Sequence, residues 1–488
     1  MVSLATKIDG APTGPDSAKP IGASPDGSAP KDGTLSRGLQ DRHVQFIAIG
    51  GAIGAGLFLG AGQAIHKAGP SLLLDYAISG FIVFLIARAL GELAVYRPVS
   101  GSFASYADEF IGPWAGFLTG WSYWLNWVLA GIAEISAIGI YFHYWFPQLP
   151  QWIPALCAVA LLYGANMIAV RVYGEIEFWL ALIKVITILA LIAMGSVMIV
   201  FGVGGAHGIA DFSNLWSHGG FFPNGLSGLL LALPIAVFAF GGTEILGLTA
   251  GETKDPGKSL PKAFNGVVYR ILIFYIGALL VIMTLTPWNQ LDPAASPFVM
   301  VFARTGLPAS AAIINFVVIS AAVSSCNSGM FGTSRMLYAM AGARQAPAFL
   351  AHVNARKVPS RCLAVSVAMM LLGVLLNYLM PAEVFTYAIT GVLAFLIWTW
   401  AIIIVSHLAY RRAVRAGTKP AVAFRLPGAP VTNWIVLGFI VLILVLMAYS
   451  RDTRTAFYVS GAWFSVLVVI YLIFRPGRSS GRILPAQR

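Results

Sequence analysis

The sequence predicts an all-α protein that crosses a lipid bilayer many times. Of its 488 residues, 58% are hydrophobic and only 10% are charged, whereas a soluble domain carries about 25% charged residues. The mean hydropathy is high, at +0.79. The apolar residues also gather into stretches of about 20, the length that a helix needs to cross the hydrocarbon core. This composition argues against a soluble enzyme of the same length.

Twelve stretches meet that length criterion. Residues 1–38 precede them and are rich in Gly, Ala, Pro, Ser, Asp and Lys, without the apolar segment of a signal peptide, so we expect a disordered cytoplasmic tail there. The transmembrane domain is expected at 39–475, followed by a cytoplasmic tail at 476–488. The expected membrane helices are 44–66, 70–95, 114–145, 152–171, 178–202, 226–250, 264–287, 309–341, 361–380, 384–408, 432–449 and 456–474.

The positive charges predict the orientation of these helices, because cytoplasmic loops carry an excess of Lys and Arg. With both termini in the cytoplasm, 23 of the 31 Lys and Arg residues fall in cytoplasmic segments and four fall in outside loops. The net charge of +12 therefore reflects membrane orientation, and no nucleic-acid partner is expected. The other four basic residues lie within the expected spans, and they are Arg88, Lys184, Arg270 and Arg335.

The cysteines predict neither a metal site nor a disulfide framework. Cys157, Cys326 and Cys362 stand far apart in or beside apolar stretches, without the spacing that such sites need. The spans also contain no short motif with paired carboxylates and no nucleophile–base pair that would indicate an enzyme. We therefore expect no cofactor, no metal and no catalysis.

Two of the expected helices contain segments that are poor helix interiors. Residues 50–56 of the first span place four glycines in seven positions, and residues 238–244 of the sixth read Phe-Ala-Phe-Gly-Gly-Thr-Glu. Glycine destabilises a helix interior by roughly 1 kcal/mol relative to alanine, and transporters break helices near the bilayer midplane. The two segments lie five spans apart, so they occupy corresponding positions in two five-helix halves of opposite direction. We therefore expect an inverted repeat of 44–202 and 226–408, followed by accessory helices at 432–474.

A pair of broken helices suits a zwitterion. Where a helix breaks, several N–H groups lose their partners and point into the gap with a partial positive charge, which binds a carboxylate without a basic side chain. The freed carbonyls of the other broken helix can accept from an ammonium group. The two breaks therefore predict a site for a free α-amino acid. The alternative is that the glycines only allow close helix packing.

Ionisable residues inside a membrane are costly and need a reason. Lys184 lies roughly 10 Å inside the fifth span, where an amine can exchange its proton within a physiological range. It therefore predicts proton coupling, and the alternative is a lysine that reaches the cytoplasmic headgroups. Glu134 near the midplane of the third span and Glu244 after the second break could carry a proton, orient the substrate amine or serve as structural hydrogen-bonding groups.

The other charged residues of the spans are expected to be structural. Arg88 and Glu92 are spaced i, i+4 and predict a local ion pair. Arg270 and Arg335 lie near cytoplasmic helix ends and are expected to snorkel to the headgroups.

Side-chain selectivity is expected from spans three, six, eight and ten, where one or two methyl groups decide the available volume. In the eighth span, Ser324, Ser325 and Asn327 are polar enough to contribute. They could equally hydrogen-bond within that span.

Five short motifs carry a family resemblance. They are 51–58 (Gly-Ala-Ile-Gly-Ala-Gly-Leu-Phe), 100–103 (Ser-Gly-Ser-Phe), 174–179 (Gly-Glu-Ile-Glu-Phe-Trp), 238–244 and 250–256 (Ala-Gly-Glu-Thr-Lys-Asp-Pro). Together they resemble the bacterial amino acid permeases, the amino acid transporter family of the amino acid–polyamine–organocation superfamily, over about residues 36–475. The resemblance implies a LeuT-like fold of two inverted five-helix repeats plus two accessory helices. It also implies a multi-pass protein of the bacterial inner membrane that works by alternating access as a proton symporter.

The resemblance further implies how the substrate carboxylate and the proton are held. The backbone at Gly54, Ala55 and Gly56 would hold the carboxylate. Lys184 matches the family's lysine in span five, which occupies the place of a sodium ion in sodium-coupled relatives, and it would carry the proton. Glu134, from its position near the midplane, is the second residue expected to take part in proton coupling. Ala55 departs from the commonest family form, which has Thr, so a hydroxyl is absent while the backbone N–H remains.

The same resemblance assigns the amino-group side of the site. The carbonyls of Ala52, Phe238 and Gly241 would receive the substrate amine. The ring of Phe238 matches an aromatic gate over the bound substrate. Ile53 and Ala239 complete the two substrate-binding segments.

Other stretches resemble permeases of particular substrates. Residues 96–101 and 425–430 look closest to asparagine permeases, segment six and 452–454 look like proline-specific permeases, and 259–263 is shared with D-serine/D-alanine/glycine transporters. We therefore expect import of a neutral L-amino acid of the asparagine, proline or small neutral type by proton symport. The alternatives are an amino acid exchanger without net proton movement and a non-transporting amino acid sensor.

Overall fold

The chain folds into a bundle of helices. Its computed structural model describes residues 43–46, 53–168, 170–202, 211–293, 296–303 and 310–476. The expected N-terminal tail, residues 50–52 of the first broken segment and the residues from 477 onward lie outside this description. In chain order the α-helices are α2 (Ala55–Phe58), α3 (Gly60–Ala68), α4 (Leu72–Tyr96), α5 (Ser102–Phe110), α6 (Pro113–Phe142), α7 (Trp152–Asn166), α8 (Val170–Phe201), α9 (Gly225–Phe238), α10 (Ile245–Thr249), α11 (Pro256–Arg270), α12 (Ala278–Leu285), α13 (Pro297–Ala303), α14 (Ser310–Gly342), α15 (Ser360–Leu379), α16 (Val384–Arg415), α17 (Val431–Tyr449) and α18 (Arg451–Phe474).

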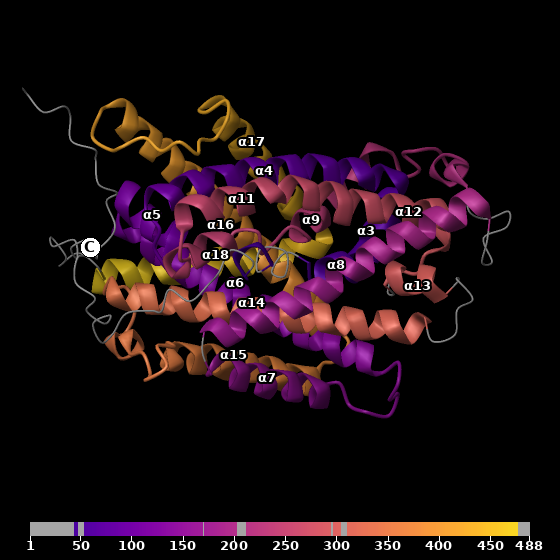
Figure 1. Cartoon of the computed structure of the whole chain (residues 1–488), viewed down its shortest axis with the longest axis horizontal. Helices are drawn as coiled ribbons and strands as arrows, with labels where there is room; N and C mark the ends of the chain where they lie inside the picture. The colour runs from indigo at the N-terminus through magenta and orange to yellow at the C-terminus, as the bar shows by residue number, and fades with distance from the viewer. Residues whose placement is uncertain are drawn as a thin grey trace, which may run out of the picture.

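The helices have the length and composition of membrane spans. Within the described residues, nine helical stretches are long and apolar enough to cross a bilayer, and two further apolar helices, α7 and α9, have 15 and 14 residues. Each of the twelve expected spans corresponds to one of these helices or to a pair of shorter ones. Figure 1 shows the long helices lying nearly parallel to the long axis of the molecule. The predicted fold class is confirmed: the chain is a polytopic, helical membrane protein.

The first and sixth spans are both interrupted, where the sequence predicted breaks. In the first, a bend at Ile53 and Gly54 precedes α2, which is only four residues long. In the sixth, α9 ends at Phe238 and α10 begins at Ile245. Gly242 in that gap has φ of +96°, a conformation that only glycine adopts without steric cost. The backbone therefore leaves the helical path in both spans.

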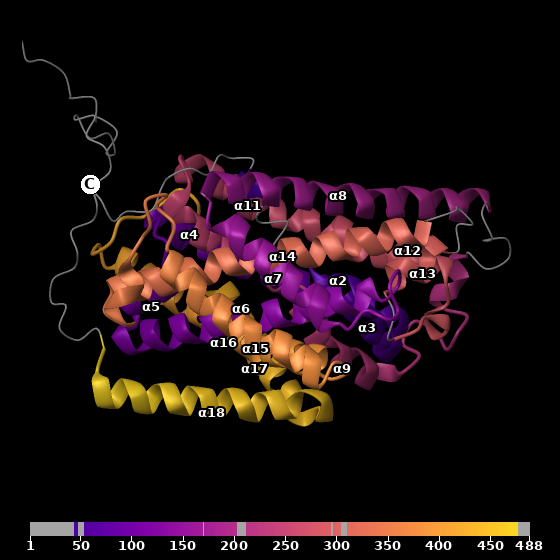
Figure 2. The same cartoon turned by 90° about the horizontal axis from the view of Figure 1, so that it is seen from below.

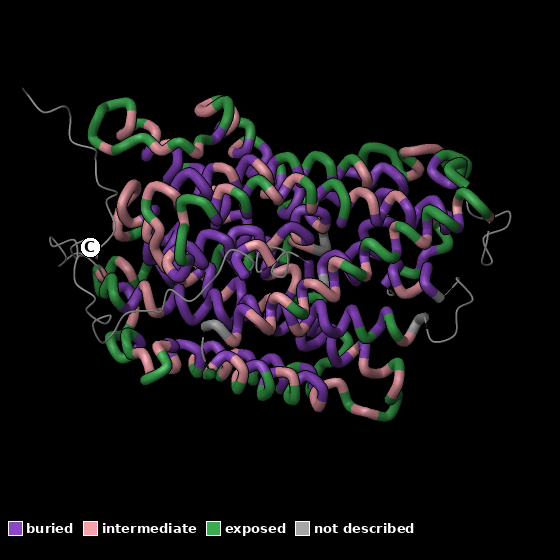
Figure 3. Tube along the Cα trace, in the orientation of Figure 1, coloured by how far each residue is buried: buried purple, intermediate pink, exposed green. Residues whose placement is uncertain are grey.

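Three helices form the centre of the bundle and α18 lies at its edge. α6 packs against both α14 and α16. The most apolar stretch of α14 is 83% buried, whereas that of α18 is 11% buried. Figure 2 shows α18 running along one edge of the bundle, on the opposite side from α8. Figure 3 shows the buried residues inside and the exposed ones on the outer faces, an arrangement that places the candidate site in the interior and turns apolar surface toward lipid.

Some elements differ from the sequence-based expectation. α5 and α13 have nine and seven residues, so neither could meet a criterion of about 20 apolar residues. α8 begins at Val170 rather than at the expected 178. Glu177 therefore lies two turns inside that helix and not in the connection before it.

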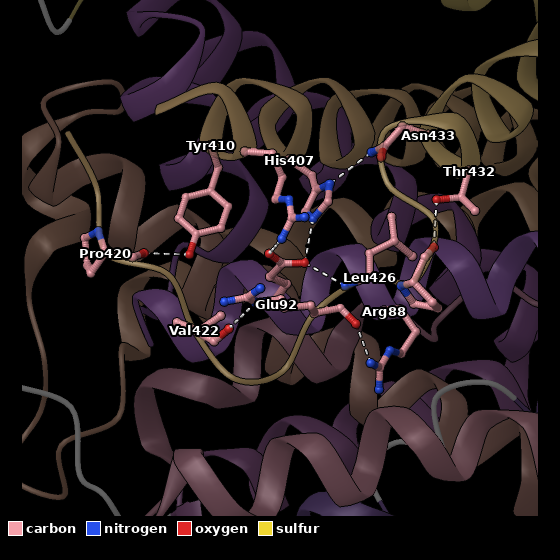
Figure 4. Close-up of polar contacts among 12 residues, drawn as sticks. Arg88, Glu92, His407, Tyr410, Pro420, Val422, Leu426, Thr432 and Asn433 are labelled. Carbon is pink, nitrogen blue, oxygen red and sulfur yellow. Dashed lines mark hydrogen bonds and ion pairs between the residues drawn. The ribbon is translucent and has the colours of Figure 1, made fainter. Parts of the chain in front are cut away.

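The expected local ion pair between Arg88 and Glu92 is wrong. Arg88 Nη1 donates to the side chain of Asn265 on α11 at 2.6 Å. Glu92 is buried and its carboxylate pairs with His407 Nε2 at 2.9 Å (Figure 4). It also pairs with Arg411 Nη1 at 3.0 Å. The i, i+4 spacing allowed a local pair, but Glu92 points into the bundle toward α16.

The expectation that Arg335 snorkels is also wrong. Its guanidinium is buried, with Nε 2.8 Å from Glu252 Oε1, and it lies 3.8 Å over the ring of Phe331. Tyr173 of α8 stacks on Phe331, with the two ring centroids 4.2 Å apart. A buried carboxylate partner from the 3-10 turn Ala250–Glu252, which follows α10, thus replaces the headgroup contact that the sequence suggested.

Candidate functional site

The two breaks meet at a cavity in the middle of the bundle. Its wall comes from both broken spans and from α6, α14 and α16, which correspond to the third, eighth and tenth expected spans. The lining residues are Gly54, Gly56, Asn126, Trp127, Ala130, Glu134, Phe238, Ala239, Gly241, Gly242, Ser325 and Val392.

The first break presents a helix start to this cavity. The earliest hydrogen bonds of α2 are donated by the N–H groups of Leu57 and Phe58 to the carbonyl of Gly54, at 3.2 and 3.4 Å. The N–H groups from Gly54 to Gly56 precede these bonds and have no acceptor within the helix. They form a locus of partial positive charge that favours an anionic group.

Two glycines let other helices approach this break closely. A Cβ on Gly54 would lie 2.4 Å from Glu134 Oε1 and 2.8 Å from Ser325 Oγ. A Cβ on Gly56 would lie 3.0 Å from the ring of Phe238. Real Cβ atoms do not tolerate distances under 3.0 Å, so the missing side chains create the space in which α6, α14 and α9 face the break.

The second break is stabilised by hydrogen bonds within the segment itself and by one from the seventh span. The N–H of Gly241 donates to the carbonyl of Phe238 at 2.9 Å. The N–H of Gly242 donates to the carboxylate of Glu244 at 3.2 Å, and the hydroxyl of Tyr275 donates to the carbonyl of Ala239 at 3.0 Å. Glu244 is buried, and its hydrogen bond with Gly242 supports the turn that lines the cavity. Among the described residues, Glu244 itself is not one that lines the cavity.

Lys184 joins α8 to the first break. Its side chain is fully buried, and Nζ donates to the carbonyl of Ile53 at 2.8 Å. The lysine therefore lies behind the same backbone segment whose other side faces the cavity. Glu134, in contrast, lines the cavity itself.

The structure brings most of the sequence-predicted site residues together. Six of them line the cavity, and they are Gly54, Gly56, Glu134, Phe238, Ala239 and Gly241. Ile53, Lys184 and Glu244 lie directly behind the two breaks. Of Ala55 only the backbone is described, and Ala52 lies outside the described residues.

Several cavity residues have no clear signal in the sequence. Ala130 and Val392 are small or aliphatic residues of apolar spans, where nothing distinguishes a lining position from a packing position. Asn126 interrupts an aromatic run of α6, and this polar interruption of an apolar span is the signal that could have marked it. Ser325 belongs to the polar group of α14 that the sequence indicated as a possible contributor to selectivity, and it lines the cavity.

Comparison with known proteins agrees with this architecture. The family model described as "Amino acid permease" matches residues 43–478. The chain is 49% identical to the uncharacterized amino acid permease YtnA of Bacillus subtilis (strain 168), over 90% of this chain and 94% of the relative. It is 44% identical to the probable threonine/serine transporter YbxG of the same organism, over 91% and 96%, and 43% identical to the D-serine/D-alanine/glycine transporter of Escherichia coli (strain K12), over 93% and 97%. These matches show that the chain belongs to the amino acid permease family.

Proposed function

We propose that this permease imports a neutral amino acid across the bacterial inner membrane by proton symport. The observation that carries the proposal is the meeting of two broken helices at one cavity, with Lys184 bonded to the carbonyl of Ile53 behind the first break. Both termini would lie in the cytoplasm. The halves 44–202 and 226–408 would rock against each other to open the cavity to either side in turn.

The two ends of an amino acid would bind the two breaks. Its carboxylate would accept from the N–H groups of Gly54 to Gly56, ahead of the first hydrogen bonds of α2. Its ammonium group would donate to the carbonyls of Phe238 and Gly241, which border the cavity. The ring of Phe238 lies against Gly56 and would close over the bound substrate.

Lys184 would couple the proton to the substrate. A protonated amine donates a stronger hydrogen bond to a carbonyl than a neutral one, so protonation would hold α8 against the first break. Substrate and proton would then favour the same conformation of that segment, and each would raise the affinity for the other. Glu134, which reaches the cavity from α6, would be the second coupling group.

The cavity wall favours a small substrate side chain. Trp127, Phe238 and Val392 supply bulk, while Asn126 and Ser325 supply polar groups. The relatives named as a probable threonine/serine transporter and a D-serine/D-alanine/glycine transporter support the same class. We infer a small neutral amino acid as the substrate.

Uptake of radiolabelled neutral amino acids into proteoliposomes tests this function. We expect accumulation when the outside is more acidic than the inside, and only equilibration without the gradient. Accumulation that ignores the gradient would contradict symport and favour an exchanger. Binding without any uptake would favour a sensor.

A further inference from the structure

Glu177 of α8 is a buried carboxyl to which the proposed transport cycle assigns no role. Its side chain has no exposed surface. The hydroxyl of Ser324 donates to Oε1, and Asn327 Nδ2 donates to Oε2 at 3.0 Å. Both donors come from α14, the central helix that also supplies Ser325 to the cavity.

This cluster joins three helices, but linking helices does not require an ionisable side chain at position 177. Asn166 of α7 donates from Nδ2 to Asn327 Oδ1 at 2.7 Å, so α7, α8 and α14 are linked through side chains. Amides and hydroxyls link membrane helices without the cost of an ionisable group. Carboxyls inside a membrane mark ion or proton pathways far more often than they mark packing contacts.

The position of Glu177 relates it to Lys184. The two residues are seven apart on α8, which is close to two full turns, so they share one face and are separated by about 10 Å along the axis. Helical side chains tilt toward the N-terminus of their helix, and the lysine therefore leans toward the glutamate. In the proposed orientation Glu177 lies on the cytoplasmic side of Lys184.

Other acids on that side already have basic side chains as partners. Glu252 pairs with Arg335 at 2.8 Å, and Glu175 pairs with the ring of His43 at 3.2 Å. Within the described residues, the side chains that donate hydrogen bonds to Glu177 are the uncharged Ser324 and Asn327. Other ionisable groups lie on the elements that pack against α8, with Tyr173 on α8 itself. They are Cys157 and Tyr163 on α7, Cys326, Arg335 and Tyr338 on α14, and Tyr275 in the π-helical segment Ile271–Gly277. Glu134 lies on the cavity side.

We propose that Glu177 receives the proton that Lys184 releases toward the cytoplasm. In this step an N–H bond of the lysine ammonium breaks and an O–H bond forms on the carboxylate, through water admitted as α8 and α14 separate. The products are a neutral lysine amine and a neutral carboxylic acid, which then releases its proton to cytoplasmic water. Ser324 and Asn327 act as positioning residues that hold the carboxylate on the lysine face of α8.

The experiment separates proton release from substrate movement. Glu177→Gln keeps the size of the side chain and its capacity to accept from Ser324, while it cannot take up a proton. Counterflow exchange of labelled substrate needs no net proton release, whereas accumulation under a pH gradient needs it in every cycle. We expect exchange close to wild type and gradient-driven accumulation slowed by about tenfold or more, since a positioned proton-transfer group typically contributes at least that factor.

A matched control lies two residues away. Glu175→Gln removes an acid of the same helix that is 32% exposed and bonded to His43, and we expect it to leave both assays unchanged. Equal losses of exchange and accumulation in Glu177→Gln, with a lower melting temperature, would overturn the proposed proton relay from Lys184 to Glu177 in favour of a purely structural role of Glu177. Wild-type rates in both assays would overturn it as well.

The proposed relay rests on proton symport, and the wild-type control distinguishes a failure of symport from a failure of the relay alone. If wild-type protein shows no gradient-driven accumulation, symport itself fails and the relay falls with it. If wild type accumulates substrate and Glu177→Gln does so equally well, only the relay fails.

A second measurement tests the proposal even if the Glu177→Gln variant folds poorly. Infrared difference spectra of wild type and Glu177→Asp, recorded on substrate addition, report the C=O stretch of a buried carboxylic acid. A substrate-dependent band that shifts in the aspartate variant supports proton uptake at this position. A band that is the same in both proteins overturns it.

Discussion

Gly54 shows how much of the site depends on an atom that is missing. The position faces Glu134 from α6 and Ser325 from α14, and both side chains fill the space that a Cβ would need. The backbone is thereby open to the cavity on one side, while Lys184 holds the neighbouring carbonyl on the other. Three helices thus converge on two residues of the first break.

We predict that Gly54→Ala weakens substrate binding by at least about tenfold, equivalent to about 1.4 kcal/mol. The added methyl would lie 2.4 Å from Glu134 Oε1 and would displace the carboxylate or the break. Gly60→Ala is the matched control, because its Cβ would meet only Ile235 at an ordinary 3.9 Å. Binding of labelled substrate to purified protein measures both, and equal affinities in the two variants would contradict the placement of the site.

Glu109 of α5 lies outside the membrane spans and should make stability depend on pH. Burial raises the pKa of its carboxyl, but hydrogen bonds from Lys419, Arg97 and Tyr96 outweigh burial and leave the pKa below its ordinary value of about 4.5. The contacts measure 2.6, 2.7 and 2.9 Å. A carboxyl with a lowered pKa in the folded state stabilises that state above the ordinary value, and the contribution is lost as pH falls through the lowered pKa.

We therefore predict that Glu109→Gln lowers the melting temperature at neutral pH and that its difference from wild type disappears in acid. The loss should begin below about pH 4.5. Melting curves of both proteins in detergent over a pH series provide the measurement. A difference that stays constant down to strong acid would refute the assignment.

At the scale of elements, Glu92 anchors the segment between α16 and α17. Its carboxylate binds His407 and Arg411 of α16 and accepts from the backbone N–H of Leu426 at 2.7 Å. Asn433 of α17 contacts the other ring nitrogen of His407 at 2.9 Å. One acid of α4 thereby fixes two later helices and the connection between them (Figure 4).

Replacing this acid should be costly. We predict that Glu92→Ala destabilises the folded protein by about 3 to 5 kcal/mol, since it leaves the buried ring of His407 and the partly buried guanidinium of Arg411 without the carboxylate that they contact. Asp255→Asn removes an exposed acid 3.7 Å from Lys258 and should cost at most about 1 kcal/mol. Unfolding in detergent compares the two, and similar small losses would show that the buried cluster is not an anchor.

The elements also show what a sequence can and cannot predict. The broken spans were predictable because glycines are visible in composition, and the candidate cavity follows from bringing two breaks together. The partners of Glu92 lie more than 300 residues away, and no local pattern connects them. Glu177 was missed because a charged residue directly before the expected start of the span at 178 resembles a helix flank, although the helix begins about two turns earlier, at Val170.

At the scale of the whole molecule, the bundle has a buried centre and a lipid-facing rim. The described helices surround α6 and α14, and α18 remains at the periphery. Alternating access would require that the centre open to one side at a time, so orientation in the membrane decides which segments border each opening. The positive charges predict that the segment before α11 lies in the cytoplasm and the segment before α9 outside.

Cysteine labelling in intact cells tests this orientation. In a variant without the three native cysteines, Ser217→Cys should react with a membrane-impermeant maleimide, because Ser217 is exposed in the segment before α9. Lys258→Cys, with 80% of the native side chain exposed, should react only after the cells are opened. The reverse pattern would invert the topology.

Proton influx that depends on substrate tests the central claim most directly. Proteoliposomes that contain a pH-sensitive dye would be given a small neutral amino acid, with no other driving force. We predict that wild type acidifies the interior and that Lys184→Met does not, while the variant still exchanges labelled substrate by counterflow. Acidification by Lys184→Met at the wild-type rate, or none by wild type during demonstrable uptake, would contradict a proton symporter in which Lys184 couples the proton to the substrate.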